Sequence, residues 1–298
     1  MVLGEIPTTR VSARLQQSPG HLIRVAQQVH TRLWSEHVGA DLTAPQFAVL
    51  LVLALEPGAD QRTVGERASL DKATMAEMVA RLVRRGLVLR RRDPADGRRK
   101  LLALSQSGAQ AVREATGGVV RVQRTLFEPL SSEEQLELVR VMAKIARLEP
   151  AQVAVLTDAR PMLDAQRAIG YLIRVSQQVH TKLWSEHVGS ELTAPQYAVL
   201  DALELEPGAD QRTVGELASL DKATMAEMVS RLVRRGLVQR RRDPSDGRRN
   251  LLSLSPAGQD LLHRSAAGVA QVQLLLLAPL DEDEHEAALA LIAKAARL

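Results

Sequence analysis

Residues 71–108 read DKATMAEMVARLVRRGLVLRRRDPADGRRKLLALSQSG. Asp71 suits the N-cap of a helix, and Gly86 is a typical residue just past a helix end. Between them, apolar residues recur at helical spacing, which predicts a helix over about Lys72–Arg85. The residues expected on its inner side are Met75, Met78, Val79 and Leu82.

The residues after Gly86 predict a β-hairpin. LVLRRR and KLLALS both suit strands, and they flank DPADGR, in which Asp-Pro and Asp-Gly are turn dipeptides. A shorter helix, capped by Asp60 and expected over about Gln61–Ser69, comes just before the helix over Lys72–Arg85. Two helices joined by such a short turn form a helix-turn-helix. Followed by a hairpin, they predict a winged helix.

Further helices are expected on both sides of the winged helix. Ser18-Pro19 resembles an N-cap followed by a first-turn proline, and Thr43 with Gln46 and Ser131 with Glu134 form capping boxes. The expected spans are about 19–38, 44–55, 105–127 and 131–148. Gly117-Gly118 falls inside the third of them, where glycine costs about 1 kcal/mol relative to alanine. We therefore expect either a bend there or the close approach of another backbone.

The whole pattern occurs twice at an offset of 150 residues. Residues 21–110 and 171–260 are identical at 71 of 90 positions. This period is far too long for a solenoid repeat, so we interpret it as a duplicated domain. The expected domains are 1–148 and 171–298, joined by an ordered connector over 149–170.

Composition excludes several classes of protein. The chain has no cysteine, which excludes disulfides, thiolate metal sites and cysteine nucleophiles. It has only two Phe, two Trp and two Tyr, too few for a base-stacking platform that binds single-stranded nucleic acid. Its apolar runs fall short of the roughly 20 residues that a membrane span needs. We expect a cytoplasmic protein with no membrane partner.

The positive charge is concentrated in two windows. Residues 81–100 carry +7 and residues 231–250 carry +6, whereas the whole chain has a net charge of +4. The remainder of the chain therefore carries −9. Cations on the second helix of a helix-turn-helix and on its hairpin are typical of a duplex-binding surface. The alternative is that these cations form an ordinary solvated face. The basic cluster follows a helix-turn-helix in both repeats, which disfavours this alternative.

Residues 71–108 resemble the signature of the MarR family: a recognition helix, Gly-Leu-Val, an arginine-rich hairpin with Asp-Pro-x-Asp-x-Arg, then Leu-x-Leu-Ser and Gly. The resemblance implies a mostly α-helical regulator with two winged helix-turn-helix domains and a shared helical dimerisation body. Family members work as homodimers, and many repress a gene until a small, often aromatic and anionic molecule releases them from DNA. The duplication then implies a single-chain pseudo-dimer that needs no second chain.

Candidate DNA contacts come from the first turns of the recognition helices and from the hairpins. Thr74 could contact a thymine methyl or a phosphate, and Glu77 could accept from cytosine or instead pair with Arg81. The resemblance assigns Arg98 and Arg248 to the wing tip that enters the minor groove. The candidates are Lys72, Thr74, Met75, Glu77, Arg81, Arg90, Arg91, Arg98 and Arg99, with Lys222, Thr224, Met225, Glu227, Arg231, Arg240, Arg241, Arg248 and Arg249.

The first helix of each repeat carries a second candidate site. The resemblance implies a ligand pocket between this helix and the winged-helix core. Arginine, histidine and an indole suit an aromatic carboxylate or a phenol, although the same residues could simply pack an interface. The candidates are Arg24, His30, Trp34, Arg174, His180 and Trp184. No metal or other cofactor is expected, because the histidines lack carboxylates at fitting spacing.

The sequence has no nucleophile elbow, phosphate loop or dinucleotide fingerprint, so we do not expect an enzyme. The predicted function is a DNA-binding transcriptional regulator, in the first place a repressor, acting on a pseudo-palindromic duplex with half-sites about one helical turn apart. The alternative is a descendant of such a regulator that no longer binds DNA and instead sequesters a ligand or a partner.

Overall fold

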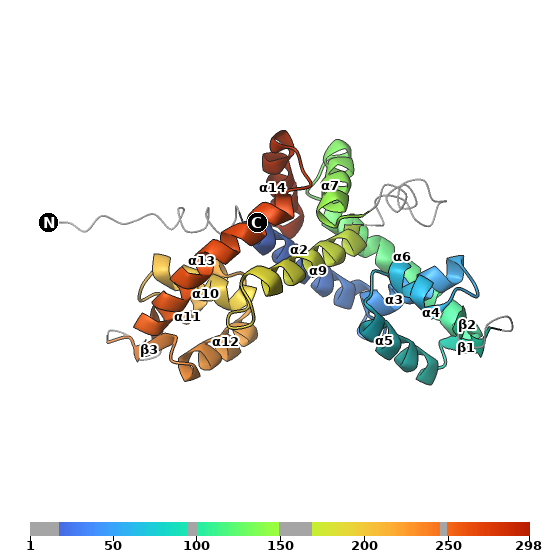
Figure 1. The fold of residues 1–298 in the computed structure, drawn as a ribbon, viewed down its shortest axis with the longest axis horizontal. Helices are drawn as coiled ribbons and strands as arrows, with labels where there is room; N and C mark the ends of the chain where they lie inside the picture. Colours follow the sequence, from blue (N-terminus) through green and yellow to red (C-terminus); the bar gives the residue numbers. More distant parts are fainter. Residues whose placement is uncertain (1–17, 94–99, 149–168, 245–248) are drawn as a thin grey trace. The chain divides into compact units, whose positions relative to one another are not determined.

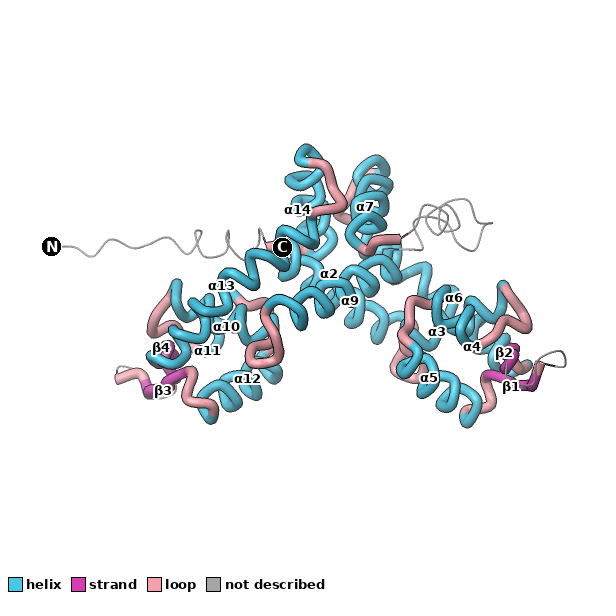
Figure 2. Tube along the Cα trace, in the orientation of Figure 1, coloured by secondary structure: helices cyan, strands magenta, loops and turns pink. Residues whose placement is uncertain are grey.

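The computed structural model describes residues 18–93, 100–148, 169–244 and 249–298, and it is mostly helical (Figures 1 and 2). The first repeat comprises α2 (Pro19–His37), α3 (Ala44–Leu55), α4 (Gln61–Arg67), α5 (Lys72–Arg84), β1 (Val88–Arg92), β2 (Lys100–Leu104), α6 (Gln106–Phe127) and α7 (Ser132–Ile145). The second comprises α9 (Ile169–His187), α10 (Ala194–Leu205), α11 (Gln211–Leu217), α12 (Lys222–Arg234), β3 (Val238–Arg242), β4 (Asn250–Leu254), α13 (Pro256–Leu277) and α14 (Glu282–Ala296). The predicted fold class is confirmed.

Local caps account for where the helices begin. The Asp60 carboxylate accepts a hydrogen bond from the backbone N–H of Thr63, 2.9 Å away, and Asp71 caps α5 in the same manner. Thr43 forms the predicted capping box at the start of α3. Gly86 ends the recognition helix with a φ of 70°, a backbone conformation that favours glycine.

The wing is a two-stranded antiparallel hairpin in each repeat (magenta in Figure 2). In the first, Val88 pairs with Leu104, and Arg92 pairs with Lys100 at the end of the hairpin next to its turn. Backbone hydrogen bonds of 3.0 Å join Leu102 to Gly58 and to Ala59, which fixes the hairpin against the residues that precede α4. The wing tips, 94–99 and 245–248, and most of the predicted connector lie outside the described residues.

The chain divides into two compact units. Of the described residues, we call 28–93, 100–128, 169 and 170 the N-terminal unit, and 18–27, 129–148, 171–244 and 249–298 the composite unit. The composite unit therefore combines the start of α2 and all of α7, from the first repeat, with nearly all of the second repeat.

Each unit contains one winged-helix core of the same design. In the N-terminal unit Leu50, Val64 and Leu82 are fully buried, and the Trp34 indole N–H donates to the carbonyl of Leu42 over 2.6 Å. The composite unit repeats this arrangement, with Trp184 donating to Leu192 over 2.6 Å. Similar patterns of apolar residues have thus produced similar cores.

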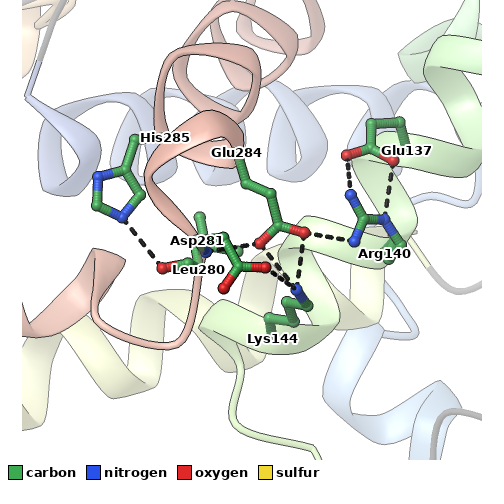
Figure 3. A network of polar contacts seen from close by, with 7 residues as sticks. All are labelled: Glu137, Arg140, Lys144, Leu280, Asp281, Glu284 and His285. Carbon is green, nitrogen blue, oxygen red and sulfur yellow. Dashed lines mark hydrogen bonds and ion pairs between the residues drawn. The ribbon is translucent and has the colours of Figure 1, made fainter.

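Within the composite unit, α7 of the first repeat packs against α14 of the second (Figure 3). The Glu284 carboxylate accepts two hydrogen bonds from Lys144, at 2.7 and 2.8 Å, and another from Arg140. Arg140 also binds Glu137 on its own helix. Lys144, the backbone N–H of Asp281 and Arg140 together lower the pKa of Glu284 to about 2. Elements of the two repeats therefore pair within one chain.

Among the described helices, none is by itself long and apolar enough to cross a membrane. Helices α13 and α14 pass such a test only as a pair, which is bent by 100°.

Candidate nucleic-acid interface and ligand cavity

Both recognition helices, α5 and α12, expose their first turns. Lys72, Thr74 and Glu77 are exposed, as are their counterparts in α12. The prediction was wrong for Met75 and Met225, whose side chains are 2% and 1% exposed. These two methionines pack into the winged-helix cores, so they cannot reach a base edge.

Thr74 and its cap are tied to each other. The Thr74 hydroxyl donates to one carboxylate oxygen of Asp71 over 2.5 Å, and its backbone N–H donates to the other over 3.0 Å. The hydrogen bonds from Thr74 lower the pKa of Asp71. Because the hydroxyl proton already has an acceptor, the two predicted contacts of Thr74, with a thymine methyl or with a phosphate, are no longer equally favoured. Contact through its methyl group fits better than donation to a phosphate.

Glu227 in α12 forms the ion pair that was one of the two alternatives for this helix position. Arg231, one turn later, donates to it over 2.5 Å. This pair neutralises one cation of the recognition helix. It also holds the carboxylate on the helix surface.

The wing arginines differ in what they contact. Arg90 and Arg91 of β1 are exposed, and so are Arg240 and Arg241 of β3. Arg249 instead binds Asp210, the N-cap of α11, at 2.7 Å. Hydrogen bonds from the backbone of Thr213 and from Arg249 lower the pKa of Asp210 to about 2. Arg249 therefore fastens the wing to α11, a role that was not predicted. Arg98, Arg99 and Arg248 lie outside the described residues.

A small cavity of about 40 Å³ lies in the composite unit, between the start of α2 and the winged-helix core of the second repeat. Three of the predicted ligand residues line it: Arg24, His180 and Trp184. The prediction missed His21, Tyr197 and Gln273, which also line it. His21 lies three residues before Arg24 on the same helix face, a spacing that could have identified it.

Arg24 and His21 connect this cavity to the turn of the second helix-turn-helix. Arg24 donates to the carbonyl of Ala218 over 2.7 Å and to that of Ser219 over 3.4 Å. The His21 ring lies 3.0 Å from the Arg24 guanidinium through Nδ1 and 3.2 Å from the Ser219 hydroxyl through Nε2. Ser219 has a φ of 51°, which is uncommon for serine. The cavity wall therefore holds the turn immediately before α12.

Burial sets the charge of these groups. Desolvation, together with the nearby charge of Arg24, lowers the pKa of His21 to about 3 and that of His180 to about 4. Desolvation also lowers the pKa of Arg24, to about 10. At neutral pH the cavity is therefore lined by two neutral imidazoles and one guanidinium cation.

The folded chain is expected to lose stability as the pH falls from about 6.5 to about 4. In this window the unfolded chain protonates both histidines while the folded chain leaves them neutral. Each contributes up to about 1.4 kcal/mol per pH unit. His21→Gln should remove about half of this slope, because His180 still titrates. Urea unfolding at pH 7, 6 and 5 measures the slope, and an unchanged slope in the variant would contradict the prediction.

The remaining predicted ligand residues occupy other places. Arg174, in the composite unit, is buried and lies 5.2 Å from the centre of the Tyr171 ring. His30 and Trp34 belong to the N-terminal unit, where their ring centres are 5.8 Å apart. Trp34 and Trp184 are each buried with the indole N–H satisfied, and Trp184 in addition lines the cavity. Among the described residues no group of histidines and carboxylates could hold a metal ion.

The sequence of this chain is similar to a known protein family and to individual transcriptional regulators. The MarR family model matches residues 40–99 and 190–249. The transcriptional regulator HosA of Escherichia coli O111:H- is 40% identical over 131 residues, which are 43% of this chain and 96% of HosA. The HTH-type transcriptional repressor NicR of Pseudomonas putida is 30% identical over 132 residues, or 44% of this chain and 84% of NicR. Each relative therefore matches a length of chain close to one repeat.

Among solved structures, the PcaV transcriptional regulator from Streptomyces coelicolor, in complex with its natural ligand, is similar to this chain. It shares 41% identity, and the match covers 50% of this chain and 99% of PcaV with a TM-score of 0.43.

Proposed function

The chain belongs to the MarR family of transcriptional regulators, and we propose that it binds double-stranded DNA through both recognition helices and both wings. One observation carries this proposal. Helices α5 and α12 have the same sequence except for Ala80 against Ser230, and both expose their first turn beside a strand rich in arginine. A copy freed from DNA contact had no need to keep these cations, which disfavours the sequestering alternative.

The two copies act as one single-chain pseudo-dimer on a pseudo-palindromic operator. Half-sites about 10 base pairs apart would place both recognition helices in major grooves on one side of the duplex. Covalent connection makes the pairing of the repeats intramolecular, so a single chain suffices at any concentration. The contacts of α7 with α14 support this pairing.

The cavity in the composite unit is the effector site of this proposal. Arg24 supplies a cation for a carboxylate, and the Trp184 and Tyr197 rings suit an aromatic body. A cavity of about 40 Å³ is smaller than a benzoate-sized molecule, so an effector must displace part of the wall. The wall that yields is Arg24 with His21, because a carboxylate competes with the carbonyls of Ala218 and Ser219 for the guanidinium.

Effector binding then releases the turn before α12, and the second recognition helix loses its placement on DNA. This sequence of events describes a repressor relieved by a small aromatic acid. The name of the relative NicR, a transcriptional repressor, supports that direction of control.

Duplex binding and its salt dependence test the proposal. Fluorescence anisotropy with a duplex from the region upstream of the protein's own coding sequence should show an affinity that falls steeply with salt. Lys72→Ala with Lys222→Ala should weaken binding to any sequence and make the slope of log K against log salt about 2 units shallower, if both lysines contact phosphates. Lys182→Ala, on α9, is the control. A wild-type protein that ignores duplex at low salt would overturn the proposal in favour of the sequestering alternative.

A further inference from the structure

The two DNA-facing surfaces differ at few positions. Residues 60–100 and 210–250 differ at positions 67, 80, 89, 95 and 100 of the first copy. Two of these differences remove a positive charge from the second copy: Arg67 is replaced by Leu217, and Lys100 by Asn250. The recognition-helix residues expected to face bases are the same in both.

Lys100 is the charge difference that bears on DNA. Arg67 is already paired with Glu56 at 3.4 Å, so its charge is balanced within the protein. Lys100 is exposed and makes no ion pair with the residues that the structure describes. It therefore adds a cation to the first copy that the second copy lacks.

Lys100 lines an open groove of about 810 Å³ in the N-terminal unit. The groove brings together cations from three elements: Arg62 of α4, Lys72 at the start of α5, and Lys100 at the start of β2. Glu66 balances Arg62 at 2.8 Å, which leaves Lys72 and Lys100 as the cations available to an anion. Lys72 begins the recognition helix, so an anion held here lies at the edge of the surface that is proposed to bind duplex.

Lys100 is expected to destabilise the hairpin of the first wing. In the hairpin register Lys100 is directly opposite Arg92, and like charges in such a pair destabilise a hairpin. The second copy has Asn250 opposite Arg242 and avoids this repulsion. A polyanion bound in the groove would compensate for the repulsion in the first copy.

We propose that this groove is a backbone-phosphate site whose cation set is complete only in the first copy. The inference rests on the proposed function. Because the recognition helices are alike, both halves read the same bases. The two copies bind the DNA backbone unequally, and the first copy makes the stronger phosphate contacts. The regulator therefore has a built-in polarity even on a base-symmetric operator.

Exchanging the two residues tests the unequal grip. Lys100→Asn should make the slope of log K against log salt shallower by about 0.9, the value of one phosphate contact, and Asn250→Lys should make it steeper by about 0.9. The double exchange should restore the wild-type slope. Lys182→Asn makes the same charge change on α9, in the composite unit, and should leave the slope unaltered. Thermal unfolding checks that each surface variant is folded.

The orientation of the bound protein tests the polarity. Since the chain has no cysteine, Leu89→Cys or Gln239→Cys creates a single attachment point for an iron chelate on one wing. The operator is a perfect palindrome with methylphosphonates replacing the phosphates of one half. Cleavage from position 89 should concentrate on the intact half and cleavage from position 239 on the neutralised half. The Lys100→Asn with Asn250→Lys background should reverse this preference.

Equal cleavage of both halves, or salt slopes that the exchanges leave unchanged, would overturn the inference while the proposed function stands. Wild-type protein that binds no duplex at low salt would instead overturn the proposed function. The two failures are therefore distinguishable in the same set of measurements.

Discussion

Gly118→Ala is expected to lower the free energy of unfolding by about 1 to 3 kcal/mol, the usual cost of overpacking, and by an amount near the upper end because the neighbour is rigid. A Cβ atom at this position would lie 2.3 Å from the backbone carbonyl oxygen of His37. A backbone atom at the end of α2 cannot swing aside as a side chain does. The neighbouring helix α6 therefore needs hydrogen at this position, despite the lower helix propensity of glycine.

The residue next to it provides a matched control. A Cβ atom at Gly117 meets only the end of the flexible Arg121 side chain, at 3.8 Å. Gly117→Ala should therefore stabilise α6 by up to about 1 kcal/mol, the usual gain in an exposed helix. Urea unfolding of both variants gives the two free energies. A Gly118→Ala protein as stable as Gly117→Ala would show that the close approach does not constrain the fold.

The second repeat provides an independent copy of this experiment. A Cβ atom at Gly268 would lie 2.3 Å from the carbonyl oxygen of His187. Gly268→Ala should therefore cost about as much as Gly118→Ala. The sequence left open whether these glycines mark a bend or a close approach. The difference is tertiary, because it depends on where the end of another helix lies.

Local features of the fold were predictable because local interactions determine them. The caps at Asp60, Asp71 and Thr43 each need only the next three residues, and each formed as expected. Met75 shows where two local rules conflict. Its place in the first turn of the recognition helix suggested a base contact, whereas its spacing with Val79 and Leu82 indicated the core, and the core position is correct.

The candidate cavity was predictable only in part. Arg24 belongs to the first repeat, and His180 and Trp184 belong to the second, at least 156 positions later in the sequence. All three nevertheless line one cavity. The resemblance pointed to the residue types but not to this combination across the repeats. Tyr197 was missed because it lies at the start of α10, whereas the candidates were all taken from the first helix of each repeat. That Arg24 would bind the turn before α12 depends entirely on the pairing of the repeats.

Arg24→Ala is expected to abolish the response to an effector. Removing one partner of a buried guanidinium–carboxylate pair costs about 2 to 5 kcal/mol, so affinity for an aromatic acid should fall at least about thirtyfold. Benzoate and its monohydroxy derivatives serve as probes in calorimetry and in release of a labelled duplex. Benzamide tests the need for a negative charge, and cyclohexanecarboxylate tests the need for an aromatic ring.

The same substitution should also weaken duplex binding in the absence of any effector, by about tenfold. Arg24 donates to the carbonyls of Ala218 and Ser219, and each such bond to a charged donor contributes about 1.5 to 3 kcal/mol, only part of which bears on the placement of α12. Arg32→Ala, an exposed change on the same helix, should alter neither property. Loss of the effector response with unchanged duplex affinity would show that Arg24 binds the effector but does not hold the turn. An intact response would show that the effector binds elsewhere. If Arg24→Ala loses the effector response and also weakens duplex binding, then an anionic effector and the turn before α12 compete for the same arginine.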